Sequence, residues 1–495
     1  MIKICDKVIK QQSQFWNHAL FHPTDAVEDP WGRRILDRMA EDGAIKTIRI
    51  YTMFEDIVYL DENGKLAFDF RVSDLRLDYL LEKGYDLLLA YGGIPDCIAS
   101  GNSKTSVSKN KTRYKGKMWN STPPKDYALW EEICYEYTKH NIERYGIETV
   151  SSWHCHCFNE PDIHHFFFAD QPENSEATEK YRLPAYCKLY EAFERGVRRA
   201  SERICIGGPA LAYRKDFLEG FLNFVKEKEL RLDYVALHNY GTNVGELNDG
   251  SKPIAVENQL EKYEKYVDII CKCGFNDIEI VLDEWGASAQ GFYNIEECPS
   301  LIFRENEVYS AYFVKLIAKL IEAGYNISKM MICLSGQHEM VTDFSGFRNF
   351  FTLNFITKPI YNAHLMSSKL HNLLVESNTE SENIFAVSTK NLKGDYTTLL
   401  TYCSKNFKED LPKIEEQVVF AEDVSDKTVT VWCIDKTHNN PYRMWEREGK
   451  PEMNDELLSA LRKEGRLKPL TVQKGNETIK LSLTPNATYL ITVTD

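Results

Sequence analysis

The sequence lacks the features that carry a chain into or across a membrane. No stretch approaches ~18 apolar residues without a charge, so we expect no transmembrane helix and no membrane partner. The start, MIKICDKVIKQQSQ, has no apolar segment and no small-residue cleavage site of the kind that marks a secretory signal. We therefore expect a cytoplasmic protein.

A disulfide framework and a metal-binding spacing are also missing. The 13 cysteines are odd in number and scattered, which favours free thiols in a reducing compartment. The run His154-Cys155-His156-Cys157 looks like a metal cluster, but side chains alternate along a strand, so these four cannot converge on one ion. Cys271 and Cys273 have the wrong spacing for a zinc or redox site. We expect no metal and no cofactor.

Basic residues are in short supply. There are 60 Lys and Arg against 74 Asp and Glu, and the formal net charge is −14. Nucleic acids and anionic membranes require a basic surface, so neither is expected as a partner. Aromatic residues, by contrast, reach 12%, and their rings pack cores and also form platforms for flat ligand faces such as sugar rings.

Short apolar strands alternate with longer segments of helical period over residues 11–374. This alternation, repeated eight times, predicts a (β/α)8 TIM barrel. An open doubly wound sheet is the alternative, but no glycine-rich phosphate-binding turn follows an early strand. The expected strands are 14–20, 45–52, 85–92, 148–158, 204–208, 233–240, 277–285 and 329–335, and the clearest helices are 30–42, 72–84, 126–146, 307–324 and 358–374.

The pattern changes at about residue 375. Short strands separated by turn signals predict a C-terminal β-sandwich over residues 375–495, interrupted by one helix at 453–465. Residues 1–10 precede the first barrel strand and are expected to add a strand to this second domain.

Two acidic residues end predicted barrel strands, where barrel enzymes place their catalytic groups. Glu160 follows strand four in Phe-Asn-Glu-Pro-Asp, and Glu284 ends strand seven in Leu-Asp-Glu-Trp-Gly. Two opposed carboxyls at such a rim are what glycoside hydrolysis requires. Asn159 offers an amide donor for a sugar hydroxyl, and Trp285 is expected to exclude water. The alternative is a chance pair of solvated or helix-capping acids.

Further candidates lie on neighbouring strands. His238 and Tyr240 are two apart on strand six, so both face the same side, beside strand seven. We expect one or both to orient Glu284 or a sugar hydroxyl, the alternative for His238 being a core histidine. Trp119, at the end of the polar loop 101–120, is a candidate sugar platform. Gln337, His338 and Glu339, after strand eight, are candidate specificity residues, or else an ordinary polar rim.

Several ordered segments resemble glycoside hydrolase family 39, the β-xylosidase and α-L-iduronidase family of clan A. The resemblance rests on the Asn-Glu-Pro after strand four and the Glu ending strand seven, together with segments 121–146, 206–211, 233–241, 358–364 and 438–451. It implies a retaining double displacement in which Glu160 is the acid/base and Glu284 the nucleophile. It also places Arg49 near the nucleophile, an alternative being a structural ion pair, and leaves a homo-oligomer open.

The sequence departs from the xylosidase pattern near the sugar. Tyr51 stands where similar xylosidases carry His, and Phe158 where they carry Trp. Asp162 and Asp283 resemble the iduronidase branch, yet no Lys or Arg follows directly after strand six to bind a uronide carboxylate. The resulting hypothesis is a β-xylosidase-like enzyme that releases a non-reducing-end sugar from small oligosaccharides. The alternatives are an α-L-arabinosidase, β-glucosidase or uronide hydrolase, or a non-catalytic sugar-binding protein.

Overall fold

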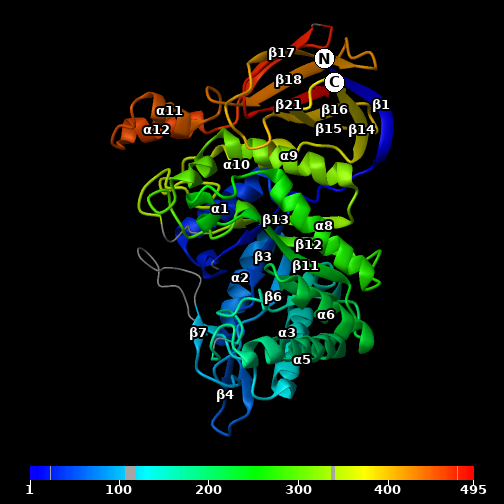
Figure 1. Cartoon of the computed structure of the whole chain (residues 1–495), viewed down its shortest axis with the longest axis vertical. Coiled ribbons are helices and arrows are strands. Elements are labelled where there is room, and N and C mark those ends of the chain that lie inside the picture. Colours follow the sequence, from blue (N-terminus) through cyan, green and yellow to red (C-terminus); the bar gives the residue numbers. More distant parts are fainter. Residues whose placement is uncertain (23, 106–118, 169, 336–339, 477) are drawn as a thin grey trace.

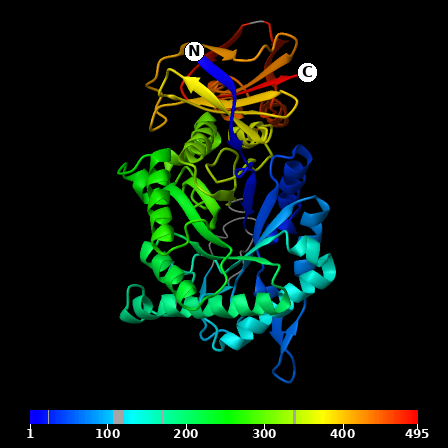
Figure 2. The same cartoon turned by 90° about the vertical axis from the view of Figure 1, so that its right-hand side faces the viewer.

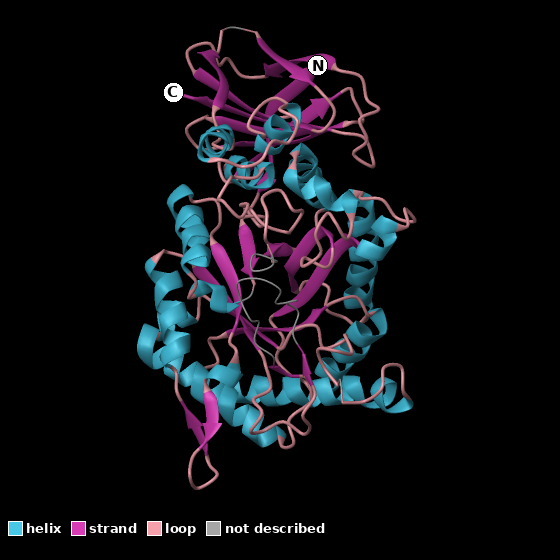
Figure 3. Cartoon of the chain, turned by 90° about the vertical axis from the view of Figure 1, so that its left-hand side faces the viewer, coloured by secondary structure: helices cyan, strands magenta, loops and turns pink. Residues whose placement is uncertain are grey.

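The larger part of the molecule is a closed barrel of parallel strands enclosed by helices. The computed structural model describes residues 1–22, 24–105, 119–168, 170–335, 340–476 and 478–495. Figure 3 shows the helices arranged around the strands. The barrel strands, in chain order, are β2 (His18–Phe21), β3 (Thr47–Tyr51), β6 (Asp86–Tyr91), β9 (His154–Cys157), β10 (Cys205–Leu211), β11 (Tyr234–Thr242), β12 (Glu279–Ser288) and β13 (Ile327–Leu334). The predicted TIM barrel is confirmed.

The barrel helices begin and end where local chemistry favours it. In α1 (Pro30–Asp42), the Asp29 carboxylate accepts a hydrogen bond from the Trp31 N–H, and Gly43 ends the helix with φ of 65°. A cap oxygen, an early Pro and a left-handed Gly together define both ends. The others are α2 (Arg71–Glu82), α3 (Tyr127–Tyr145), α4 (Ile147–Val150), α5 (Glu176–Ala200), α6 (Lys215–Glu227), α7 (Val244–Asn248), α8 (Val256–Lys272), α9 (Glu307–Ala323) and α10 (Pro359–Ser367).

Two predicted elements differ from the structure. The segment expected as one strand at 148–158 begins in the short helix α4, and β9 itself starts only at His154. A segment of only four residues is too short to show a period that separates a helical turn from a strand. The helix expected at 358–374 ends at Ser367, because the chain turns there and the strand β14 (Leu373–Thr379) follows.

Nine of the remaining strands form one sheet beyond the barrel. This confirms a C-terminal sheet domain, although the predicted β-sandwich takes the form of a single curled sheet. The sheet runs in the order β19-β18-β21-β16-β15-β14-β1-β17-β20 and contains both chain termini (Figures 1 and 2). Its strands are hydrogen-bonded as one curled sheet, with a parallel pair between β1 and β17. They are β1 (Ile2–Gln11), β14, β15 (Ile384–Lys390), β16 (Tyr396–Tyr402), β17 (Ile414–Phe420), β18 (Thr428–Ile434), β19 (Pro469–Lys474), β20 (Ile479–Leu483) and β21 (Ala487–Thr494).

One face of the curled sheet packs on itself and the other packs on the barrel. Side chains of β1, β17 and β20 share a core with those of β18 and β21. On the other face, Phe407 lies 5.3 Å from the Tyr312 ring of α9. Arg443, on α11 (Pro441–Arg447), pairs with the buried Glu307 at 2.7 Å. Helix α12 (Asp455–Glu464) matches the predicted helix at 453–465.

Within the described residues, no helix is both long enough and apolar enough to cross a membrane. Two short hairpins complete the structure, and they lie outside both large sheets. They are formed by β4 (Val58–Leu60) with β5 (Leu66–Phe68), and by β7 (Lys104–Thr105) with β8 (Trp119–Asn120).

Candidate active site

A cavity of about 1090 Å³ opens at the carboxyl ends of the barrel strands. Several strands contribute to it because the ends of parallel strands meet at one face of a barrel. Its lining includes Tyr51 from β3, Asn159 and Glu160 after β9, Tyr240 from β11, Glu284 from β12, and Ser335 and Arg348 beyond β13.

Glu284 is surrounded by hydrogen-bond donors. Arg49 Nη1 donates to Oε1 at 2.8 Å, and the Tyr51 hydroxyl donates to the same oxygen at 3.3 Å. The Tyr240 hydroxyl donates to Oε2 at 2.7 Å. Burial alone would raise the pKa of Glu284, but His238 and Arg49 outweigh it and hold this pKa well below its usual range. Glu284 is therefore an ionised carboxylate.

Arg49 is fully buried at the centre of this network. Its Nη2 lies 3.0 Å from Oδ2 of Asp283 and donates to Oδ1 of Asn159 at 2.6 Å. Its Nε donates to Nε2 of His156 at 3.2 Å. Both interpretations of Arg49 therefore hold, because its guanidinium forms a buried ion pair with Asp283 and also contacts Glu284.

Glu160 has a different environment. Its backbone is left-handed, with φ of 46°, and its N–H donates to the carbonyl of Ala210 at 3.0 Å. Among the described residues, its side-chain hydrogen-bond partner is His238, whose Nδ1 lies 2.8 Å from Oε1. Burial and the charge of Glu284 raise the pKa of Glu160, although His238 opposes them. This carboxyl therefore holds a proton at higher pH than an ordinary Glu.

The two carboxyls face each other across a short gap. An oxygen of Glu160, a nitrogen of His238 and an oxygen of Glu284 all lie within 4.8 Å of one another. Retaining glycosidases place their two carboxyls ~5–5.5 Å apart, whereas inverting enzymes need ~6.5–9.5 Å to admit a water. The arrangement therefore has the spacing for direct attack by one carboxylate and proton donation by the other.

Two buried histidines of this centre have opposite charge states. Burial lowers the pKa of His238, but Glu284 and Asp283 outweigh this effect and raise the pKa to about 10. Burial and the neighbouring Arg49 lower the pKa of His156 to about 3. His238 is thus a cation between the carboxyls, whereas His156 is a neutral acceptor.

Comparison with known proteins identifies the family. The profile of glycosyl hydrolases family 39 matches residues 2–468. The chain belongs to this family. A β-xylosidase from Caldicellulosiruptor saccharolyticus is 24% identical over 500 residues, which cover 97% of this chain and 95% of that protein. Human α-L-iduronidase is 23% identical over 292 residues, or 56% of this chain and 37% of the relative.

Solved structures support the same fold. A monomeric β-xylosidase from Caulobacter crescentus CB15 superimposes with a TM-score of 0.82 over 100% of this chain and 99% of that chain, at 17% identity. The protein is a glycoside hydrolase of a retaining family, as its sequence predicted.

Of the predicted site residues of this family 39 enzyme, Arg49, His238 and Trp285 lie outside the described pocket lining, although Arg49 and His238 contact its carboxyls. Trp285 was also a candidate to contact the substrate, but it is fully buried and stacks on Phe313 at 5.6 Å, so this prediction is wrong. It follows Glu284 on β12, and alternation along the strand turns it outward to the helices. Trp119 lies in β8, but its side chain is outside the described part of the structure, as are residues 336–339, which include Glu339.

Arg348 is a pocket residue that the sequence interpretation missed. Its guanidinium lies 4.8 Å from the Tyr240 ring, and its Nε and Nη2 donate to Oγ of Ser335 at 3.2 and 3.1 Å. Its Nη1 is buried and has no hydrogen-bond partner among the described residues. Gly291 leaves room for this arrangement, since a Cβ there would lie 1.8 Å from Oγ of Ser335. The sequence signal that could have identified it is a single cation in the phenylalanine-rich segment 344–351.

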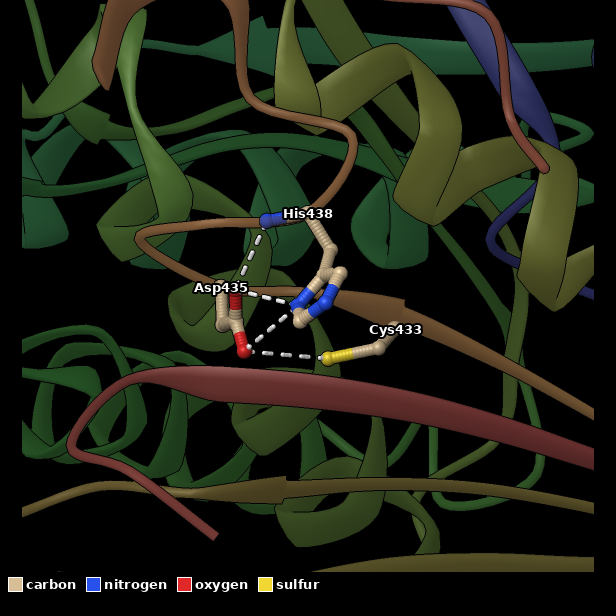
Figure 4. A group of neighbouring side chains, drawn as sticks. All are labelled: Cys433, Asp435 and His438. Carbon is tan, nitrogen blue, oxygen red and sulfur yellow. Dashed lines mark hydrogen bonds and ion pairs between the residues drawn. The ribbon is translucent and has the colours of Figure 1, made fainter. Parts of the chain in front are cut away.

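A second cluster of potential metal ligands lies in the sheet domain (Figure 4). Sγ of Cys433 and Nδ1 of His438 both lie near the Asp435 carboxylate, at 3.4 and 3.0 Å. That carboxylate already accepts hydrogen bonds from the N–H groups of Thr437 and His438. The cluster thus orders the turn that leads to Asn440, whose Nδ2 donates to Glu307 of the barrel at 2.8 Å.

Proposed function

We propose that Glu284 is the nucleophile and Glu160 the acid/base of a retaining double displacement. In the first step a Glu284 oxygen bonds to the anomeric carbon, the glycosidic bond breaks, and Glu160 gives its proton to the departing oxygen. In the second step Glu160 takes a proton from water, whose oxygen replaces Glu284 at the same carbon. The main support for this proposal is that carboxyl oxygens of Glu160 and Glu284 lie within 4.8 Å of each other, while the pKa values of the two groups are shifted in opposite directions.

The surrounding residues support this division of roles. Arg49, Tyr51 and Tyr240 stabilise the charge of Glu284 and aim its oxygens into the cavity. Asn159 lines the cavity beside Glu160 and is held by Arg49, so its amide is placed to bind a sugar hydroxyl. His238 helps to hold both carboxyls in place, because it is fully buried and is hydrogen-bonded to Glu160.

We propose a β-xylosidase-like activity that releases a non-reducing-end sugar from small oligosaccharides. The support is the similarity to a β-xylosidase over almost the full length of both chains. We also place the enzyme in the cytoplasm, on the basis of its 13 free cysteines. An arabinoside or glucoside remains an alternative glycone.

A uronide is a second candidate glycone, and Arg348 favours it. This guanidinium is 7% exposed, it lines the cavity, and no described carboxylate lies within ion-pair distance. A buried cation is costly unless something pairs with it, and a sugar carboxylate would supply the missing partner. Relatives named α-L-iduronidase belong to the same set of matches.

The test is hydrolysis of an aryl glycoside panel by the wild type, with Glu160→Ala and Glu284→Ala alongside. The panel contains β-D-xyloside, α-L-arabinoside, β-D-glucoside, β-D-galactoside and α-L-iduronide. Turnover of one sugar, lost in Glu284→Ala, supports the proposal and identifies the glycone. Turnover that survives in Glu284→Ala contradicts the assignment. If neither the aryl glycosides nor natural oligosaccharides are hydrolysed, a non-catalytic sugar-binding protein is favoured.

A further inference from the structure

The cavity has two sides that the proposed chemistry distinguishes. Glu160 protonates the departing oxygen, so the leaving part of the substrate lies on its side of the cavity. In the barrel, β9 is followed by β10 and β11, whereas β13, β2 and β3 are contiguous on the other side. We call the part lined from β13, β2 and β3 the glycone side, and the part lined from β10, β11 and α8 the aglycone side.

Four lysines line the aglycone side, and we call the three without an ion-pair partner among the described residues the cationic wall. They are Lys215 at the start of α6, Lys252 after α7 and Lys262 on α8. No carboxylate of the described residues lies within 4 Å of any of these three ammonium groups.

The acids near the cationic wall are already paired elsewhere. Oε2 of Glu246 accepts from the Asn243 N–H at 3.0 Å, as part of the capping box of α7. Glu261 pairs with Lys265 at 2.6 Å. The buried Asp162 accepts three backbone hydrogen bonds of 2.9 Å each from the loop after β10. The lysines therefore do not serve to neutralise these carboxylates.

An aromatic ring stands beside the wall. Tyr213 lines the cavity, and it is 55% exposed. Its N–H is one of the three donors to Asp162, so its backbone is fixed although its ring is open. Exposed rings at such places stack on sugar faces. The aglycone side thus offers a sugar platform next to unpaired positive charge.

We propose that the aglycone side binds a sugar bearing an anionic group, a carboxylate or a sulfate, through the cationic wall. The substrate is then an acidic oligosaccharide that is cut on the non-reducing side of its charged residue. This inference rests on the proposed function, because it assumes that Glu160 marks the leaving group. Burial lowers the pKa of Lys262 to about 8, and this ammonium has the most to gain from an anionic partner.

The experiment compares two aryl glycosides that differ only in charge. They are 4-carboxyphenyl and 4-carbamoylphenyl glycosides of the sugar that the panel selects, with the 4-sulfophenyl glycoside as a third substrate. We expect Lys262→Gln to lower kcat/KM for the acid about tenfold more than for the amide. Lys252→Gln should act in the same direction, and added salt should weaken the preference of the wild type.

Lys272→Gln is the matched control, because it removes the same charge from the exposed end of the same helix. The carboxyphenyl and carbamoylphenyl leaving groups differ in acidity. This difference cancels when the acid-to-amide ratio of kcat/KM in each variant is divided by the same ratio in the wild type. Equal acid-to-amide ratios in Lys262→Gln, Lys252→Gln and Lys272→Gln overturn the inference, while hydrolysis of the amide upholds the proposed function. A response of only the carboxylate or only the sulfonate substrate identifies the group that the wall recognises.

If the wild type hydrolyses neither substrate, the proposed function fails and binding decides the inference. Calorimetric titration of the xyloside pair into the wild type then replaces kinetics. Tighter binding of the acid, lost in Lys262→Gln and retained in Lys272→Gln, supports the cationic wall. Equal dissociation constants for acid and amide overturn it.

Discussion

The glycone and aglycone sides of the cavity hold their charges in opposite ways. On the glycone side, Arg49 lies between Asp283 and Glu284, fully buried and paired with both. On the aglycone side, Lys262 and its neighbours face the cavity without a carboxylate within 4 Å among the described residues. Charges that are paired inside the protein set the ionisation of the reacting groups, whereas unpaired charges are available to bind a charged group of the substrate.

The largest effect should follow from removing the nucleophile. We expect Glu284→Gln to lower kcat by about 10⁴-fold or more, because it removes the cavity carboxylate to which Arg49, Tyr51 and Tyr240 donate. Azide added to Glu284→Ala should restore turnover and give a glycosyl azide of inverted configuration, which NMR can identify. An unaffected rate would refute the assignment. Circular dichroism confirms that the variants fold.

The acid/base should show a dependence on the leaving group that the nucleophile does not. We expect Glu160→Ala to lower kcat/KM about 10²- to 10⁴-fold for sugars with poor leaving groups, and far less for activated aryl glycosides. In the wild type, kcat/KM should fall as pH rises through the elevated pKa of Glu160, because the proton is then lost. This fall of kcat/KM at high pH should be absent in Glu160→Ala. If it persists in the variant, the catalytic proton belongs to another group.

Arg348 is the exception to the comparison, since it is an unpaired cation on the glycone side. We expect Arg348→Gln to lower kcat/KM about 10- to 100-fold for an acidic glycone, mainly through KM. Gly291→Ala should mimic it, because the added Cβ would displace Ser335 and Arg348. Kinetics of both variants on xyloside and iduronide check this. A loss that is equal for the two sugars would assign Arg348 a structural role.

The smallest effect concerns the donors to Glu284. We expect Tyr240→Phe to lower kcat/KM about tenfold, because it removes the 2.7 Å hydrogen bond to Oε2. Losing a donor raises the pKa of Glu284, and the nucleophile must be ionised, so the acid limb of the pH profile should move to higher pH. Tyr51→Phe, which removes a 3.3 Å contact, should shift it less. An acid limb that does not move would contradict the role of Tyr240.

The sequence contained most of the framework but only part of the site. Strand alternation placed Glu160, Glu284, His238 and Tyr240 correctly at one end of the barrel, because the ends of parallel strands converge. The same rule should have excluded Trp285, which follows Glu284 on β12 and so faces the opposite side. The local sequence pattern predicted where residues lie on a strand better than it predicted which groups their side chains contact.

Other features depend on contacts that no local pattern contains. Arg348 enters the cavity from a loop without regular structure, and only the packing of Gly291 and Ser335 fixes its place. The short helix α4 was missed because four residues show no period, and the early end of α10 was missed because the start of β14 was not recognised in the sequence. His238 was expected to orient Glu284 or a sugar hydroxyl, and the hydrogen bond that it makes to Glu160 was not predicted.

The position of β1 has a consequence for how the chain is made. This strand lies between β14 and β17, and its first residues pair with Thr379 and Val418. A ribosome adding ~5–20 residues per second needs ~20–80 s to synthesise those partners after Ile2 has emerged. During that interval the strand is an unpaired edge next to a growing barrel. The sheet therefore closes only after β17 has been synthesised, and until then the edges of β1 are available for other pairings.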